Sequence, residues 1–190
     1  MRATLATMMI AFLALAGANT AHAQAAKTAK VIIIDGAEIT RSSLAGKDLM
    51  RQTENFSAEM EAEQARLQQD VRNTEAELIR QRAIINEDAL EEKMRIEQQR
   101  LAIAERDLRD KANRIQIAVR RATSDLQSAL QPIYQELMVQ HGANLVLERS
   151  QLILTGSGMD VTRQVIEKLD LALPSLKIVV PDAAPGASAP

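Results

Sequence analysis

The sequence predicts an α+β protein, mostly α-helical, in which a long antiparallel helical hairpin projects from a small β body. The chain has 190 residues, and only 2% of them are aromatic although 46% are hydrophobic. Such a composition, rich in Ala, Leu, Glu, Gln and Arg, is typical of long helices and coiled coils. Between residues 44 and 140 the helix breakers are limited to Gly46 and Pro132. Short strand-like runs flank this segment on both sides, and they predict the β body.

The first 23 residues are expected to be a secretory signal peptide. Arg2 precedes an apolar run at residues 5–17, and the small-residue site Ala21-His22-Ala23 follows it. A basic start, an apolar core and such a cleavage site are typical of signal peptides. The alternative is a membrane anchor, but the run is short for a span, which needs about 20 residues. The mature protein is therefore expected to begin at Gln24 and to work outside the cytoplasm.

The composition argues against several classes of function. Without Arg2, the 23 basic side chains become 22, which against 25 acidic ones gives a formal charge of −3. This balance gives no electrostatic reason to expect nucleic-acid binding. The mature chain has no cysteine and one histidine, His141, and it has no glycine-rich phosphate-binding motif. We therefore expect no enzyme, no metal site and no cofactor.

The hairpin is expected to span residues 45–140, with its tip near residues 84–88. Asn86 or Asp88 could cap the second helix, since acidic residues follow in its first turn. Pro132 is expected to kink that helix, and Gly142 is expected to end it as a left-handed cap. Because a short turn joins two long helices, they are expected to fold back against each other.

The β body is expected from the segments on either side of the hairpin. Its first part, residues 24–44, holds the strand Val31–Ile34 and a turn at Asp35-Gly36. Its second part, residues 141–173, is expected to hold two strands and a short helix, at residues 144–148, 151–155 and 163–171. Three short strands bury little surface, so oligomerisation is expected to complete the body.

The last segment, residues 174–190, is expected to be a disordered tail. It passes through Ile178, Val179 and Val180 and ends in DAAPGASAP. That ending is too poor in apolar bulk to order itself.

The second helix of the hairpin carries two apolar stripes. Met94, Leu101 and Leu108 are spaced by seven residues, and Ile115 continues them. This first stripe is expected to face the other helix, in a seam that Glu97 and Lys111 interrupt. A second stripe, two residues further on, consists of Ile96, Ile103 and Ile117 and is expected to point away from that helix. Ile79 on the first helix is expected to join it near the tip.

Three segments at the ends of the hairpin share a pattern with a known family. They are VIIID at residues 31–35, GANLVLE at 142–148 and DVTRQVIEKL at 160–169. The last one matches the pattern D-[IV]-T-x-x-V-x-x-x-L through Asp160, Val161, Thr162, Val165 and Leu169. With the long charged hairpin between them, they make residues 30–171 resemble the Skp/OmpH family of periplasmic chaperones.

The resemblance implies a jellyfish-like homotrimer in the periplasm, with a shared β body and three helical arms around a cavity. It implies that the cavity holds unfolded outer-membrane β-barrel proteins without ATP. The second stripe, Ile79, Ile96, Ile103 and Ile117, would then form a sparse apolar ridge that binds clients. The chain departs from the strongly basic members of the family in its slightly acidic charge and in its extension beyond Pro174.

Other interpretations stay open at this point. Isolated exposed isoleucines are common on protein surfaces, so the second stripe could be ordinary surface. A cluster of basic residues near the tip could contact lipid headgroups or acidic client segments, or be simply solvated: Arg80, Arg82, Lys93 and Arg95. The alternative function is a structural coiled-coil protein of the envelope whose arm docks one specific folded partner. Such an arm would carry aromatic or arginine anchors in a contiguous patch, and this chain lacks the aromatics.

Overall fold

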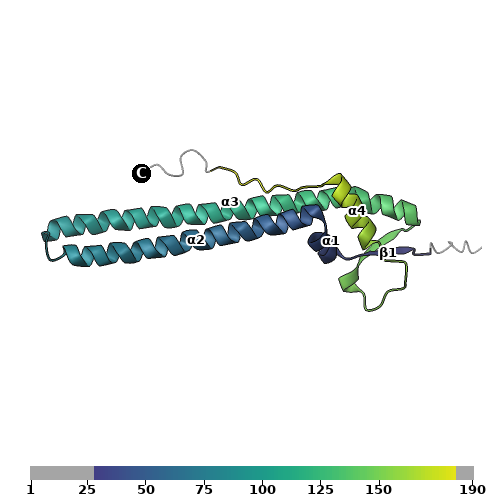
Figure 1. The fold of residues 1–190 in the computed structure, drawn as a ribbon, viewed down its shortest axis with the longest axis horizontal. Coiled ribbons are helices and arrows are strands. Elements are labelled where there is room, and N and C mark those ends of the chain that lie inside the picture. The colour runs from purple at the N-terminus through teal and green to yellow at the C-terminus, as the bar shows by residue number, and fades with distance from the viewer. Residues whose placement is uncertain (1–27, 183–190) are drawn as a thin grey trace, which may run out of the picture.

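The computed structural model describes residues 28–182, which form a long arm and a small body at its base (Figure 1). The elements in chain order are β1 (Val31–Ile34), α1 (Gly36–Ser42), α2 (Leu44–Gln81), α3 (Glu87–His141), β2 (Leu145–Glu148), the 3-10 helix η1 (Arg149–Gln151) and α4 (Thr162–Ala172). The predicted fold class, mostly helical with a long hairpin and a small sheet, is confirmed. The expected signal peptide, residues 1–23, lies outside the described residues.

The arm consists of α2, with 38 residues, and α3, with 55 residues, which run side by side (Figure 1). The turn at the tip spans residues 82–86, and the Asn86 side chain accepts a hydrogen bond from the backbone N–H of Ala89 at 2.9 Å. At the other end, Gly142 caps α3 in the left-handed region with φ of 60°. Pro132 lies inside α3, which continues through it to His141. None of the described helices combines the length and apolarity needed to cross a membrane.

The sheet of the body has two parallel strands among the described residues, β1 and β2, with Val31 opposite Leu145. On its other side, β1 forms a bridge between Ile33 and Asp160. The prediction of a strand at residues 151–155 is wrong. After η1 the chain is irregular, with Ile153 98% exposed and Leu154 90% exposed. A β-branched and apolar run forms a strand only where a neighbour supplies a hydrogen-bonding edge and a packing face, and the described residues supply neither to this loop.

Helix α1 stands where the sequence predicted a turn. The Asp35 carboxylate caps it by accepting a hydrogen bond from the N–H of Glu38 at 2.8 Å. The N–H of Asp35 itself donates to the Thr162 hydroxyl at 2.9 Å. Ser43 then ends α1 and caps α2, since its hydroxyl accepts a hydrogen bond from the N–H of Gly46 at 3.1 Å. The first helix of the arm thus begins two residues before Gly46, at a tight corner.

The pattern D-[IV]-T-x-x-V-x-x-x-L at residues 160–169 has a structural reason in this chain. One Asp160 oxygen accepts a hydrogen bond from the N–H of Thr162 at 2.9 Å, and the other pairs with the Arg149 guanidinium at 2.6 Å. The three apolar residues of the pattern, Val161, Val165 and Leu169, are fully buried. Asp160 therefore fixes the start of α4, while the apolar residues pack α4 into the body.

The apolar core lies in the body and in the base of the arm. It joins β1, α1 and α4 to the base-proximal parts of α2 and α3. Its buried members on α3 begin at Ile115 and continue to Leu137, and those on α2 are confined to its first turns, at Ala45 and Leu49. Beyond this base, the described parts of α2 and α3 pack mainly against each other.

The tail is not disordered over residues 174–182. Leu176 and Ile178 are buried in the apolar core, and the segment runs along the base of the arm (Figure 1). The apolar surface at the base of the arm orders this short segment, which is too poor in apolar residues to order itself. The rest of the expected tail, residues 183–190, lies outside the described residues.

An Asp160→Asn variant is expected to lose roughly 1 kcal/mol of stability at neutral pH, because a charge-assisted bond to Arg149 becomes a neutral one. Burial alone would raise the pKa of Asp160, but the hydrogen bonds from Thr162 and the charge of Arg149 outweigh it, so the pKa is lowered. A carboxylate with a lowered folded-state pKa stabilises the fold above its unfolded pKa, about 3.9, and loses this contribution as pH falls through the folded value.

The difference in stability between wild type and Asp160→Asn should therefore shrink as the pH falls below about 4. Urea unfolding at a series of pH values measures it. Other carboxylates, such as Glu38 and Asp48, also have lowered pKa values, but their effect cancels in the comparison. A gap that stays constant down to pH 2 would contradict the role given to the Asp160 charge.

Candidate functional site

The seam between α2 and α3 is half-buried along most of the arm and contains charged side chains among the apolar ones. Lys111 of α3 pairs with two carboxylates of α2, Glu59 at 2.7 Å and Glu63. The hydrogen bonds from Lys111 to Glu59 and then Glu63 raise the pKa of this lysine. Nearer the tip, Lys93 of α3 donates a hydrogen bond to the side chain of Gln81 on α2. The two residues that interrupt the apolar pattern, Glu97 and Lys111, thus lie in the seam itself.

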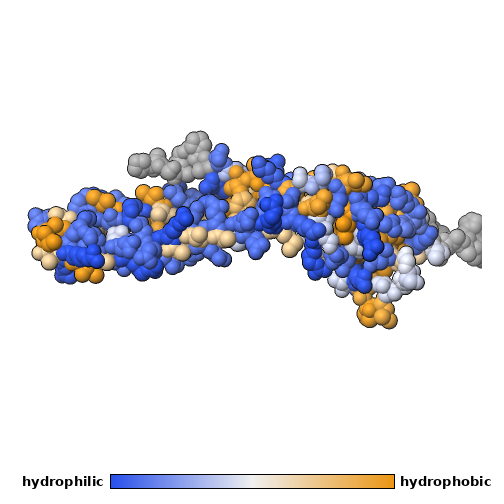
Figure 2. All heavy atoms as spheres, viewed as in Figure 1, coloured by the Kyte–Doolittle hydropathy of each residue, from blue (hydrophilic) through white to orange (hydrophobic). Residues whose placement is uncertain are grey.

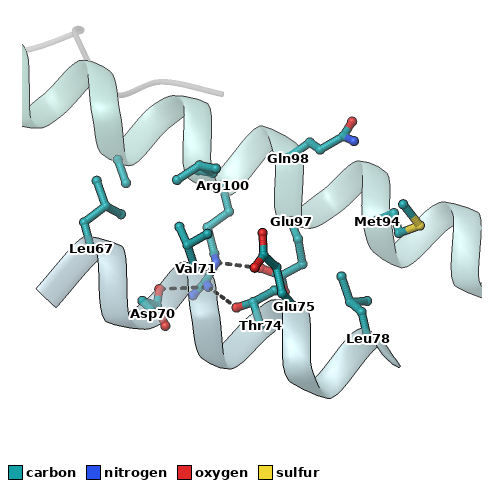
Figure 3. A pocket seen from close by; sticks show the side chains of 12 residues that line it. Leu67, Asp70, Val71, Thr74, Glu75, Leu78, Met94, Glu97, Gln98 and Arg100 are labelled. Carbon is teal, nitrogen blue, oxygen red and sulfur yellow. Dashed lines mark hydrogen bonds and ion pairs between the residues drawn. The ribbon is translucent and has the colours of Figure 1, made fainter. Parts of the chain in front are cut away.

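Arg100 makes the densest polar contact between the two helices (Figure 3). Its guanidinium lies 2.9 Å from the Asp70 carboxylate and 3.2 Å from the Thr74 hydroxyl, both on α2. On its own helix it pairs with Glu97 at 2.8 Å. The side chains of this group point toward one another across the seam, as Figure 3 shows.

Beside these polar contacts the seam has a half-open pocket of about 330 Å³. Leu67, Val71 and Leu78 of α2 line it from one side, and Met94 and Leu101 of α3 line it from the other (Figure 3). The apolar side chains of the seam are used to hold the two helices together, so the outer surface of the arm is the candidate for function.

The structure places all four predicted isoleucines on the surface of the arm. Ile79 of α2 is 74% exposed, and Ile96, Ile103 and Ile117 of α3 are 49%, 50% and 46% exposed. Leu101, Leu108 and Ile115 are less exposed, as expected for the stripe that faces α2. Met94 was expected in that stripe too; it lines the pocket between the two helices but is 43% exposed. Its neighbour Lys93 also contacts α2, through the Gln81 side chain.

The three isoleucines of α3 lie along one side of the helix. Their spacing of seven and fourteen residues returns nearly to the same angle, with a drift of about 20° per heptad in a straight helix. Asp110 takes the place between Ile103 and Ile117. Charged and polar side chains surround each isoleucine, so the arm carries separated apolar points among hydrophilic surface (Figure 2).

At the tip, the four basic residues differ in their pairing. Arg95 is paired with Glu92 through two hydrogen bonds of 2.5 and 2.9 Å, which raise the pKa of Arg95 and lower that of Glu92. Arg80 has a looser ion pair with Glu77 at 3.7 Å. Within residues 28–182, neither Arg82 nor Lys93 takes part in an ion pair. Lys93 is engaged with Gln81 in the seam, so Arg82 is the basic side chain of this group that is best placed to meet a partner.

Sequence reasoning missed several exposed apolar residues. Ile84, in the turn at the tip, is 82% exposed; its position in a turn was the available signal. On the body, the loop after η1 protrudes (Figure 1), and an apolar projection is visible there in Figure 2. Ile153 and Leu154 belong to this loop. Further large apolar residues exposed on α3, β2 and α4 are Val139, Leu145 and Leu171.

The described residues offer no metal site, since none of their His, Asp and Glu side chains gather in groups of three or more suited to an ion. His141, the one histidine of the expected mature chain, contacts the Gln164 side chain at 3.0 Å. This places it in a structural contact between α3 and α4.

Comparison with known proteins agrees with the fold described above. The family described as outer membrane protein (OmpH-like) matches residues 30–169. A crystal structure described as an OmpH-like outer membrane chaperone of Caulobacter crescentus superposes with a TM-score of 0.66. The two chains are 22% identical, and the match covers 78% of this chain and 88% of the other. No curated protein matches the sequence significantly.

The family match spans both strands, the whole arm and most of α4, and so it includes each segment that builds the body. With the arm, the parallel β1–β2 pair and the motif at α4 all in place, this chain belongs to the OmpH-like family.

Proposed function

We propose that the protein is an ATP-independent holdase of the periplasm, which binds unfolded outer-membrane β-barrel proteins and prevents their aggregation. Family membership supports a chaperone of the Skp/OmpH type. The observation that carries the finer proposal is the exposure of Ile79, Ile96, Ile103 and Ile117 along the arm, outside the stripe that holds the two helices together.

A spaced apolar stripe suits the task of holding a client without folding it. Burial of one isoleucine contributes roughly 1.5–3 kcal/mol when complete, so each contact is weak and releases quickly. Many such contacts in an enclosed space retain a client through high effective concentration. The charged residues between the isoleucines prevent two arms from adhering permanently to each other.

The enclosed space requires more than one copy of the chain, and we propose a homotrimer. The two-stranded sheet is too small to be an independent body. Within the described residues β2 has a strand partner only on the side of β1, so its other edge is open to another chain. The exposed Ile153, Leu154 and Leu171 of the body would be covered by the same association. The number three comes from the resemblance to the family.

The tips of the arms are proposed to touch the membrane surface. At the tip, Ile79 is 74% and Ile84 82% exposed, and Arg82 lies beside them. Apolar side chains combined with cations suit the boundary of an anionic bilayer. A contact there would bring the held client close to its destination.

Native mass spectrometry of residues 24–190 tests the proposal directly. The protein is measured alone and beside an unfolded outer-membrane β-barrel protein diluted from urea. We expect a trimer that gains one client per trimer and keeps the client soluble. A folded globular protein of similar mass serves as the control and should not bind. An oligomer that ignores every unfolded client would overturn the holdase proposal and favour an arm that docks one folded partner.

A further inference from the structure

The segment 174–182, which we call the strap, lies beyond the family match, which ends at residue 169. It is extended and follows the base of the arm toward the tip (Figure 1). Its side chains alternate: Leu176 and Ile178 are buried and Val180 is half-buried, while Lys177 and Val179 are exposed. This is the period of two that a β-strand shows, although the strap pairs with helices and not with a sheet.

Side chains of the arm hold the strap through hydrogen bonds to the main chain of the strap. The Gln52 side chain on α2 donates to the carbonyl of Leu176 at 2.6 Å and accepts from the N–H of Ile178 at 2.9 Å. One primary amide thus makes the two hydrogen bonds that a neighbouring strand would make. The Asp48 carboxylate accepts from the N–H of Leu176 at 3.3 Å, and Arg114 of α3 donates to the carbonyl of Pro181 at 3.0 Å.

The side chains of the strap contribute only apolar burial. Among the described residues, no hydrogen bond or ion pair involves a side chain of residues 174–182. Leu176 and Ile178 belong to the same apolar cluster as Leu49 of α2 and the small residues Ala118 and Ala122 of α3. We call the strip of α2 and α3 that the strap covers the groove. It recognises an extended main chain with apolar side chains at alternate positions, and little else of the strap sequence.

We propose that this groove at the base of the arm is a binding site for extended client segments, and that the strap occupies it in cis until a client segment displaces it. The inference rests on the proposed holdase function and names the client chemistry. Strands of outer-membrane β-barrels alternate apolar and polar side chains along segments of about ten residues. In an unfolded client, such a segment presents the main chain and the side-chain period that the strap presents.

The local concentrations of the strap and of the client segment decide which of the two occupies the groove. A tethered strap has an effective concentration in the millimolar range, so a free peptide competes poorly with it. A client held between the arms has a comparably high local concentration, and its strands can replace the strap. Between clients, the strap keeps the apolar groove covered, which prevents association of grooves with one another.

The first test uses the full chain with Leu176→Asp and Ile178→Asp, which releases the strap, and a labelled peptide of residues 174–182, PSLKIVVPD. Fluorescence anisotropy should show saturable binding to this variant, at least tenfold tighter than to wild type. A further Gln52→Ala substitution should weaken the binding tenfold or more. Gln64→Ala, an exposed glutamine further along α2, is the matched control and should leave it unchanged. No binding to a folded variant would overturn the proposal.

The second test asks whether client-like segments compete for the groove. A peptide with the alternating pattern of an outer-membrane strand should displace the labelled strap peptide. A peptide of the same composition with its apolar residues in one block should be at least tenfold weaker. If the strap peptide binds but the alternating peptide never displaces it, the strap is only a structural element and the inference fails.

Hydrogen exchange on the wild-type chain provides a measurement that needs no variant. The amides of Leu176 and Ile178, which donate to Asp48 and Gln52, should exchange several-fold faster when an unfolded client is bound. Unchanged protection with a client bound would overturn displacement while leaving the holdase function intact. Conversely, if the chain retains no client but binds alternating peptides, the proposed holdase function is refuted. The inference that the groove binds extended segments would then still hold.

Discussion

A Gly46→Ala variant is expected to be less stable than wild type by about 3 kcal/mol or more, at the upper end of what overpacking costs. Helix propensity alone would predict the opposite sign, because alanine is favoured over glycine inside a helix by about 1 kcal/mol. At this corner, however, an added Cβ would lie 2.0 Å from the carbonyl oxygen of Thr40 and 2.8 Å from the Ser43 hydroxyl. The obstacle is backbone of α1, so relief requires α1 and α2 to separate.

Gly156→Ala is the matched control for this variant. A Cβ at Gly156 would meet only the sulfur of Met159, at 3.4 Å, which is ordinary contact distance. Its stability should stay within about 0.5 kcal/mol of wild type. Urea unfolding followed by circular dichroism measures both variants. Equal stability of Gly46→Ala and wild type would show that the corner between α1 and α2 is not as tight as the structure has it.

An Ile96→Asp, Ile103→Asp double variant is expected to retain unfolded clients at least tenfold more weakly, while helicity and oligomeric state stay unchanged. Both side chains are about half-exposed and lie outside the stripe that contacts α2. Losing two partial burials of roughly 1 kcal/mol each would already account for more than tenfold in affinity. Client retention is measured by native mass spectrometry and by light scattering during dilution of the client from urea.

The control must add the same charge without removing the isoleucines. Gln99→Asp with Ala102→Asp does so on exposed positions of the same turns of α3. This variant should retain clients within about threefold of wild type, since it leaves the apolar stripe in place. If both double variants lose retention equally, the effect is one of charge and the stripe is ordinary surface. If neither loses it, clients bind elsewhere.

The arm was the most predictable part of the molecule, because its signals are local. A long segment without helix breakers needs no tertiary information to be read as helix, and Asn86 and Gly142 act as the caps expected from their residue types. The exposure of Ile96 and Ile103 followed from heptad spacing alone. In each case a short stretch of sequence contains the whole reason for the structure.

The errors concern segments whose structure depends on distant residues. Helix α1 is only seven residues long and contains β-branched residues, and it is held by Asp35, whose N–H depends on Thr162. The strap is ordered by Gln52 and Asp48, more than 120 positions earlier in the chain. The pocket along the seam was equally unpredictable, since a pattern of apolar positions does not fix the shape of the surface that the side chains make.

The charged contacts across the arm also determine how the two helices align along their length. If α3 slid along α2, Lys111 would separate from Glu59 and Glu63, and Arg100 would separate from Asp70 and Thr74. Exposed ion pairs contribute little one at a time, but the present alignment is the one that makes both sets of contacts together. A purely apolar seam would tolerate a slip more readily, as in coiled coils that lack a polar position. The arm therefore keeps a fixed reach, and every arm of an assembly would present its isoleucines at the same height above the body.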